Sequence, residues 1–207
     1  MKELTLCPED KKELEDIYAQ LQQEYERVAA ELQFSCTGCP DNCCDSYFLH
    51  HTYAEWAYLW EGVRGLDKNE QDALIERATL YLTACEQAEQ QGERPQVMCP
   101  VNNEGRCQLY KHRLLVCRTH GVPAKMTRPD GQSMQFPGCF RCQEIVEEKG
   151  AESVLTPVER TPFLRRLAIL ENQLLHMKRH LHPKARLTIA EMLVKGPPEV
   201  SFGCGEE

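Results

Sequence analysis

The sequence predicts a mainly α-helical fold in which helices frame an irregular centre that is rich in cysteine. Near both ends of the chain, apolar residues recur at steps of three and four, as they do along one face of a helix. Residues 91–150 are instead dense in glycine and proline and hold five of the 12 cysteines. Because these breakers interrupt helices and strands alike, we expect this stretch to need a further source of order.

Composition and length set the class of protein. The 207 residues fit a single domain, with 42% apolar and 27% charged residues, as in soluble proteins. Changes of pattern divide it into an N-terminal helix (1–34), a cysteine-rich core containing a helical hairpin (35–150), C-terminal helices (151–200) and a flexible tail (201–207).

Several binding classes are disfavoured by the same figures. No run approaches 18 apolar residues, so we expect no membrane span. The polar start of the chain predicts no secretory signal, which indicates the cytoplasm. A net charge of −8 disfavours nucleic acid as the main partner, because phosphate binding needs a basic surface.

Apolar periodicity and capping signals predict the helices of the first half. A helix is expected over residues 8–33, with a single apolar face formed by Leu14, Ile17, Leu21, Tyr25, Val28 and Leu32. Two capping boxes then predict helices over residues 52–65 and 67–91, joined by a short turn as a helical hairpin. Such a hairpin returns the chain toward its start.

The second half is expected to be irregular until about residue 160. Short helices are predicted near Leu109–Val116 and Cys142–Glu148. A long helix should begin at Thr161-Pro162 and run to Leu181, with a heptad-like seam of Phe163, Leu167, Leu170, Leu174, Met177 and Leu181. This 163–181 helix is also a candidate contact for a homodimer. A last helix is predicted over residues 188–195.

Charge is distributed unevenly between the two long helices. Residues 1–34 carry nine acidic and four basic side chains, whereas residues 160–186 carry seven basic and one acidic. We expect the two helices to pack side by side with complementary charge. The alternative is that the basic helix forms a docking face for an acidic partner.

Nine of the ten cysteines between residues 36 and 142 are the strongest functional signal. Two Cys-x2-Cys pairs occur, and thiolates at this spacing in a turn can face one metal ion. In a reducing compartment, clustered cysteines more often bind metal than form structural disulfides. We therefore predict metal ligation by Cys36, Cys39, Cys43, Cys44, Cys99, Cys107, Cys117, Cys139 and Cys142. The other three, Cys7, Cys85 and Cys204, are expected to be passive.

The number of metal centres is left open by the sequence. Neighbouring side chains diverge, so the adjacent Cys43 and Cys44 suit two metals, or one metal and another role. Nine thiols exceed the four that one zinc ion or one simple cluster requires. Two four-thiolate sites, one multinuclear site, or one site with spare redox-active thiols all remain consistent with this number.

The ligand set favours iron over zinc. Zinc sites often include histidine, but no histidine here has a typical finger spacing. A surplus of thiolates suits iron–sulfur chemistry, with one or two [4Fe–4S] clusters favoured and zinc as the alternative. Arg113, Arg118 and Arg141 lie close in sequence to these cysteines, where they would offset an anionic centre.

An ordered series of motifs resembles the YkgJ-like CxxCxxCC family. The series comprises Cys36–Cys44, Cys99-Pro100, Gly105–Tyr110, Arg113 and Cys117–Pro123. It departs from the family in having three residues before the paired cysteines, and Leu114 after Arg113. Proteins of that family are described as zinc- or iron-chelating and often as containing iron–sulfur clusters. The resemblance implies that residues 34–142 bind metal, with His120 beside the ligands.

Three functions follow as hypotheses. The first is an iron–sulfur protein for electron transfer, redox sensing or a coupled reaction, acting with a redox or protein partner that the sequence does not identify. The second is an interaction module stapled by structural zinc. The third is a metal-dependent enzyme, because a flagellin lysine methylase is similar in its cysteine motif. Whether the chain is an enzyme is left undecided by its motifs.

Overall fold

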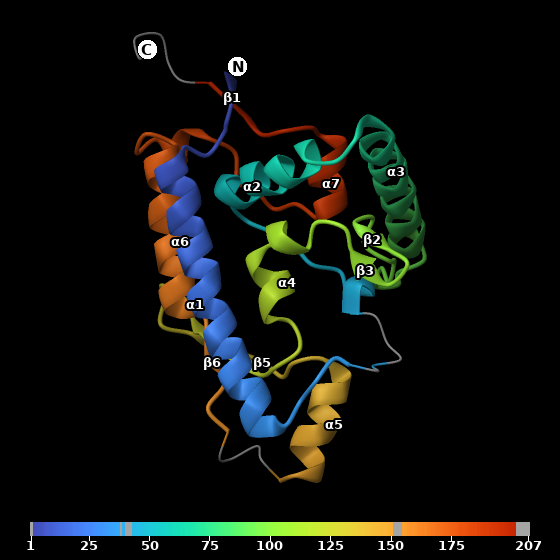
Figure 1. Ribbon diagram of the computed structural model, residues 1–207, viewed down its shortest axis with the longest axis vertical. Helices are drawn as coiled ribbons and strands as arrows, with labels where there is room; N and C mark the ends of the chain where they lie inside the picture. The colour runs from blue at the N-terminus through green and yellow to red at the C-terminus, as the bar shows by residue number, and fades with distance from the viewer. Residues whose placement is uncertain (1, 38, 40–42, 151–154, 202–207) are drawn as a thin grey trace. The chain divides into compact units, whose positions relative to one another are not determined.

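The computed structural model describes residues 2–37, 39, 43–150 and 155–201, and it is mainly helical (Figure 1). Its α-helices are α1 (Pro8–Leu32), α2 (Tyr53–Arg64), α3 (Lys68–Gln90), α4 (Leu115–Thr119), α5 (Phe140–Glu148), α6 (Thr161–Leu174) and α7 (Ile189–Val194). Single turns of 3-10 helix are η1 (Cys43–Asp45), η2 (Tyr110–His112) and η4 (Arg179–Leu181). Among the described residues, no helix combines the length and apolar character needed to cross a membrane.

Short strands complete the fold. Strand β1 (Lys2–Glu3) pairs with β7 (Glu199–Val200), and β2 (Asn102–Asn103) pairs with β3 (Arg106–Cys107). A three-stranded sheet has the order β5-β4-β6, in which β4 (Ala124–Thr127) runs antiparallel to β5 (Ser133–Phe136) and parallel to β6 (Val158–Glu159). These strands are short, so the helices carry most of the core.

The chain forms two compact units, each assembled from stretches that are distant in sequence. Unit 1 comprises Met1–Lys11, Cys44–Leu114 and Glu171–Glu207, and unit 2 comprises Lys12–Cys43 and Leu115–Leu170. The predicted 201–207 tail falls almost entirely outside the described residues. The consecutive segments predicted from sequence are thus interleaved in space.

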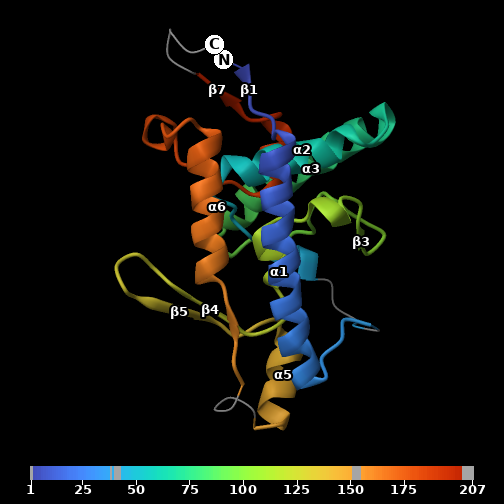
Figure 2. The same cartoon turned by 60° about the vertical axis from the view of Figure 1, so that its left-hand side comes forward.

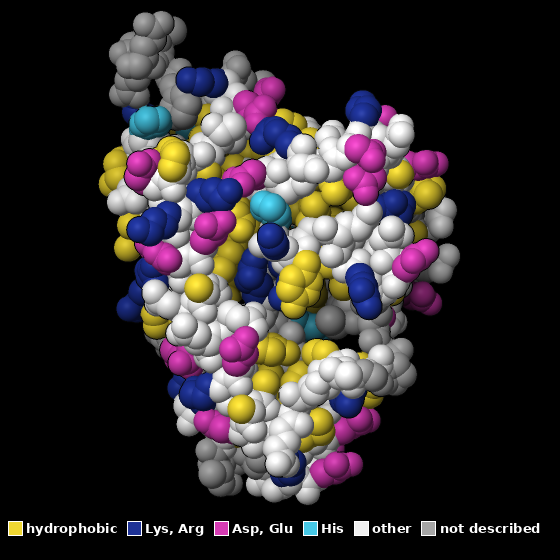
Figure 3. All heavy atoms as spheres, viewed as in Figure 1, with side chains coloured by type: hydrophobic (Ala, Val, Ile, Leu, Met, Phe, Trp, Pro, Cys, Tyr) yellow, Lys and Arg dark blue, Asp and Glu magenta, His cyan; other side chains and the backbone are white. Residues whose placement is uncertain are grey.

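The core of unit 2 is built on α1 and α6, which lie side by side in both Figure 1 and Figure 2. The predicted apolar face of α1 is buried at Leu14, Leu21 and Val28. Across the two helices, the Arg166 guanidinium donates to Glu13 Oε1 at 2.9 Å and to Gln20 Oε1 at 2.9 Å. The expected complementary charge therefore appears as a specific ion pair. Figure 3 likewise shows acidic side chains among the basic ones on that face.

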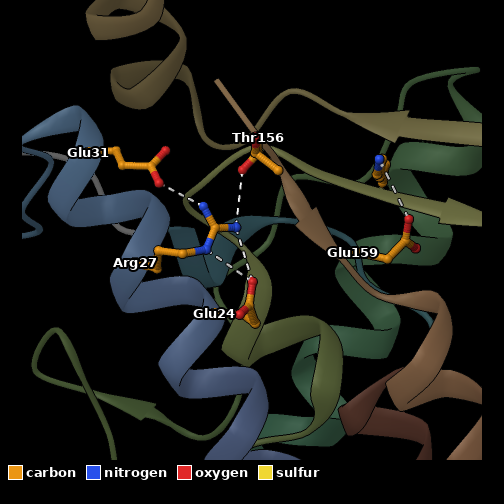
Figure 4. A network of polar contacts seen from close by, with 6 residues as sticks. Glu24, Arg27, Glu31, Thr156 and Glu159 are labelled. Carbon is orange, nitrogen blue, oxygen red and sulfur yellow. Dashed lines mark hydrogen bonds and ion pairs between the residues drawn. The ribbon is translucent and has the colours of Figure 1, made fainter. Parts of the chain in front are cut away.

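A polar network fixes α1 to the segment that leads into β6 (Figure 4). The guanidinium of Arg27 donates to Glu24 and Glu31 on its own helix, at 3.0 and 2.8 Å. It also donates to the backbone oxygen of Thr156 at 3.2 Å. Because one planar guanidinium donates to all three acceptors, the position of residue 156 along α1 is fixed by the geometry of these bonds as well as by charge.

In unit 1, α2 and α3 are joined by the predicted short turn, but α3 packs mainly against the short helix α7 and does not fold back on α2 as the predicted hairpin would. The caps predicted from sequence are confirmed: Thr52 accepts from the Glu55 N–H, and Asp67 with Glu70 forms a complete capping box. The indole N–H groups of Trp56 and Trp60 both donate to the Met192 carbonyl, at 3.2 and 2.9 Å. These aromatic residues therefore hold α2 to the end of α7.

The predicted helix over residues 161–181 was too long, because α6 ends at Leu174. His176 and Met177 have φ values of 49° and 62°, which break the helical ladder. The N–H of Met177 bonds to the Asn172 oxygen at 2.7 Å and that of His176 to the Gln173 oxygen at 2.9 Å, as in a Schellman cap. Four seam residues are buried within the protein itself: Phe163, Leu167, Leu170 and Leu174. The homodimer stays a prediction.

Residues 91–150 contain more regular structure than predicted. The hairpin β4–β5 was missed, although its turn Arg128-Pro129-Asp130-Gly131 carries a recognisable turn signal. The Gly131 N–H bonds to the Arg128 oxygen at 2.9 Å, and Gly131 has a φ of 85°. The helix predicted near Leu109–Val116 is divided into η2 and α4, and α5 begins two residues earlier than expected, at Phe140.

A buried histidine in unit 1 gives a pH-dependent prediction. The backbone of His50 pairs with Leu187 in both directions, at 2.8 and 3.0 Å, and the residue is 1% exposed. Neither of its ring nitrogens has a hydrogen-bond partner among the described residues. Burial, with a smaller contribution from His51, lowers the pKa of His50 to about 3. The fold therefore disfavours the charged imidazole.

We expect the free energy of unfolding to fall as pH decreases from about 6.5 toward 3, because His50 binds a proton in the unfolded chain but not in the folded one. Replacing His50 with leucine should flatten the pH dependence by up to about 1.4 kcal/mol per pH unit, the value for one proton. Urea unfolding at pH 4 to 7 measures this slope. His180→Leu, at an exposed position, is the control, and parallel profiles for His50→Leu and the wild type would contradict the prediction.

Candidate metal centre

Four of the predicted ligands come together within unit 2. Cys36 and Cys39 follow α1, whereas Cys139 and Cys142 lie at the start of α5. Burial, with smaller contributions from the nearby Cys139 and Cys36, raises the pKa of the Cys142 thiol to about 12. Burial also raises the pKa of Cys139, and Cys36 and Cys39 act in the same direction. We call these residues the four-thiol group.

The end of α1 directs the first Cys-x2-Cys pair. Gln33 has a φ of 53°, and the Phe34 N–H bonds to the Ala29 oxygen at 2.8 Å, so a left-handed cap stops the helix. Phe34 is then buried, and the chain turns so that the Cys39 N–H approaches the Cys36 oxygen at 3.2 Å. This local turn holds the backbones of the two cysteines close together.

The second pair is placed by the N-terminus of α5. Cys139 is the N-cap residue, and Cys142 lies in the first turn, fully buried. The backbone N–H groups of Cys142 and Arg141 favour the Cys139 thiolate, although its sulfur makes no capping hydrogen bond with them. A helix N-terminus stabilises negative charge, so it suits thiolates that bind a cation.

Lys149, at the other end of α5, joins the segments that carry the two cysteine pairs of this group. Its ammonium donates to the Leu32 oxygen at 2.7 Å and to Gln33 Oε1 at 3.0 Å. The last carbonyls of α1 carry partial negative charge, which a lysine offsets. The segments that carry the two cysteine pairs are therefore tied together independently of the thiols.

Three further predicted ligands come together within unit 1. The Cys99 N–H donates to the Cys44 oxygen at 2.8 Å, which brings η1 beside the segment that follows α3. Burial raises the pKa of the Cys99 thiol to about 12, with smaller contributions in the same direction from Cys44 and Cys107. We call Cys44, Cys99 and Cys107 the three-thiol group.

A tight hairpin holds Cys107 in this group. Asn102 pairs with Cys107 across β2–β3, and the connecting residues Glu104 and Gly105 both have positive φ, 50° and 82°, as in a type I′ turn. From α3, the Arg77 guanidinium donates to the Pro100 oxygen at 2.8 Å and to Gln108 Oε1 at 2.6 Å. The hairpin is thus anchored on both sides by one arginine.

The remaining cysteines take different places. Cys43 begins η1, but its side chain lies outside what the structure describes, as does the whole of Cys204. Cys117 is half-buried on α4, in unit 2. Cys85 is 6% exposed on α3, as expected for an apolar filler, and Cys7 is exposed.

Two of the three arginines predicted beside the metal stack on aromatic rings. The Arg113 guanidinium lies 3.8 Å from the centre of the Tyr110 ring, and that of Arg118 lies 4.3 Å from the Tyr18 ring. Arg141 is half-buried, and its Nη1 has no hydrogen-bond partner among the described residues. His120 closes α4 through a bond from its N–H to the Val116 oxygen at 2.9 Å.

Neither thiol group is arranged as an assembled metal site. Within the described part of the chain, no three Cys, His, Asp or Glu side chains are grouped closely enough to hold a metal ion. Comparisons with protein-family models, with curated proteins and with solved structures gave no match. The interpretation of the thiols therefore rests on their own chemistry and placement.

Two tyrosines beside the thiols were not singled out from the sequence. Tyr25 was assigned to the apolar face of α1, but its hydroxyl lies 4.0 Å from Cys36 Sγ. Burial raises the pKa of Tyr25, and the nearby Cys36 and Cys139 add to this shift, so the hydroxyl keeps its proton. In unit 1, Tyr81 lies near Cys85 and Cys99, and burial raises its pKa also. The sequence signal that could have identified them is the position of each tyrosine, a residue with a polar hydroxyl, within the apolar stripe of a helix.

A cavity of about 340 Å³ lies beside Tyr81 in unit 1. It is formed where α3 faces α7, and its polar lining includes Tyr47, Cys85, Glu86, Glu89 and Lys195. Glu191, which also borders it, accepts hydrogen bonds from the Thr188 N–H and hydroxyl at 2.6 and 2.9 Å. That carboxylate is therefore committed to capping α7.

Proposed function

We propose that this chain is a metal-binding cysteine-cluster protein that holds metal in two separate thiolate groups. The observation that carries the proposal is the proximity of Cys36, Cys39, Cys139 and Cys142 within unit 2, brought from segments about a hundred residues apart. Four soft donors gathered in this way match the ligand demand of zinc or of iron–sulfur clusters.

The surroundings of the four-thiol group suit bound metal. The N-terminus of α5 faces its thiols, and a half-buried arginine, Arg141, lies between Cys139 and Cys142 in sequence. Both features offset the negative charge of a tetrathiolate centre. Closing around an ion requires the sulfurs to approach one another more closely than they do in this structure, so metal binding would tighten the junction of α1 with α5.

Within this proposal we favour iron–sulfur over zinc. The ligands of both groups are thiols throughout, and the resemblance of residues 34–142 to the YkgJ-like family supports the same choice. Bound there, a cluster would supply one-electron chemistry for electron transfer or redox sensing. The alternative is a zinc-stapled interaction module, in which the metal is structural.

Anaerobic purification followed by analysis of iron, zinc and acid-labile sulfide tests the proposal. We expect on the order of 4 Fe per chain, or about twice that number if both groups hold a [4Fe–4S] cluster, together with visible absorption. Stoichiometric zinc in a colourless solution without sulfide would replace iron–sulfur with the zinc alternative. A chain that retains no metal and takes none up under reducing conditions would refute metal binding altogether.

A further inference from the structure

The hydroxyl of Tyr25 is directed at the four-thiol group. Tyr25 lies on α1, eleven residues before Cys36, and its Oη is 4.0 Å from Cys36 Sγ. Cys139 and Cys142 are also near enough to act on this hydroxyl electrostatically. One phenol from α1 thus faces cysteines of both Cys-x2-Cys pairs.

Two glycines make this approach possible. A Cβ atom on Gly121 would lie 2.6 Å from Tyr25 Oη, and Gly121 has a φ of 131°, which other residues rarely adopt. The Gly121 oxygen accepts from the Cys139 N–H at 3.2 Å. Gly138 packs on that same oxygen, which a Cβ atom at position 138 would approach to 2.7 Å. The backbone around Gly121 therefore brings the phenol and Cys139 to a common point.

We propose that Tyr25 is a positioning residue for the four-thiol group, donating an O–H···S hydrogen bond to the Cys36 thiolate when metal is bound. The inference rests on the proposed function of these thiols. A phenol in this position is a donor of the right kind, because a metal-bound thiolate is negatively charged and accepts hydrogen bonds. The bond withdraws electron density from sulfur and fixes the orientation of the Cys36 side chain.

A purely structural role for Tyr25 predicts a different outcome. Its ring also packs against Gly121, so removing the whole side chain would disturb α1 whatever the hydroxyl does. Tyr25→Phe keeps the ring and removes only the donor. This substitution therefore distinguishes the effect of the hydroxyl on the thiols from the effect of ring packing.

The test uses cobalt(II) as a spectroscopic probe in the reduced, metal-free full chain, under anaerobic conditions. Thiolate-to-cobalt charge-transfer absorption reports the electron density on sulfur directly. The difference between the wild type and Cys142→Ser isolates the four-thiol group. For Tyr25→Phe we expect unchanged cobalt stoichiometry, a shift of that absorption to lower energy, and affinity weakened by about 10-fold.

Tyr53→Phe is the matched control, because it removes a hydroxyl that bonds to the Pro183 oxygen rather than to a thiol. It should leave the absorption and affinity unchanged. A Tyr25→Phe protein that binds cobalt with the wild-type band and affinity would overturn the inference and leave the proposed function intact. Absence of thiolate–cobalt absorption in the wild type would overturn both.

A second measurement checks the geometry without metal. If the Tyr25 hydroxyl occupies the space next to Gly121, Gly121→Ala should shift the urea midpoint less in the Tyr25→Phe background than in the wild type. Equal shifts in the two backgrounds would show that the hydroxyl is not in contact with position 121, contradicting the arrangement from which Tyr25 donates.

Discussion

Replacing Cys142 with serine is expected to remove the metal of the four-thiol group and leave that of the three-thiol group in place. Cys99→Ser should do the reverse, because Cys99 lies with Cys44 and Cys107 in unit 1 whereas Cys142 lies with Cys36 and Cys139 in unit 2. A hydroxyl is a harder and weaker donor than a thiolate, so serine does not restore either site. The double variant should retain no thiolate-bound metal.

Metal content and the visible or cobalt spectrum of each variant measure this division. Cys85→Ser is the matched control, since Cys85 is also buried but belongs to neither group, and it should keep the full metal content. Far-ultraviolet circular dichroism separates loss of metal from loss of fold. If Cys142→Ser and Cys99→Ser each empty the whole protein and leave identical spectra, the nine thiols serve one multinuclear centre and the division is wrong.

Replacing Gly138 with alanine is expected to destabilise unit 2 severely. Its φ of 89° is unfavourable for alanine, and the added Cβ would lie 2.7 Å from the Gly121 oxygen, which is backbone and has little freedom to withdraw. Left-handed backbone costs alanine about 1 kcal/mol, and overpacking adds about 1–3 kcal/mol. The total is about 2–4 kcal/mol, a large share of the stability of an ordinary domain.

Gly131→Ala isolates the backbone contribution. Gly131 has a nearly identical φ of 85°, but nothing lies within 4 Å of the position its Cβ would take. This variant should cost only about 1 kcal/mol. Urea unfolding of both proteins, followed by circular dichroism, gives the comparison. Equal destabilisation by the two substitutions would show that the contact between Gly138 and the Gly121 backbone is not tight.

Helices α1, α2 and α3 were predictable from sequence because their signals are local. Each has an amphipathic period or a cap within four residues of its start, and Thr52 and Asp67 cap as their motifs indicate. The end of α6 was not predictable in this way. Met177 and Leu181 continue its apolar period, but both are exposed. The helix ends at Leu174 because the next turn contains two residues in the left-handed conformation, His176 and Met177.

The candidate site was predictable in composition but not in arrangement. Spacing alone singles out the cysteines, and residues such as Cys36 and Cys39 are brought together by a turn encoded locally. The association of that pair with Cys139 and Cys142 depends on contacts between the ends of α1 and α5, such as that of Lys149 with the Leu32 oxygen, which no local pattern records. Tyr25 was hidden for the same reason, since a tyrosine in an apolar stripe is ordinarily read as core.

The interleaving of the two units has a consequence for biosynthesis. Chains are made from the N-terminus, so unit 2 has all of its residues once Leu170 has been synthesised. Unit 1 must wait for the segment from Glu171 onward, which supplies α7 and the β7 partner of β1. The four-thiol group is therefore complete on the nascent chain while Cys44, Cys99 and Cys107 still belong to an unfinished unit. Under the proposed function, the four-thiol group is therefore able to receive metal before the three-thiol group is complete.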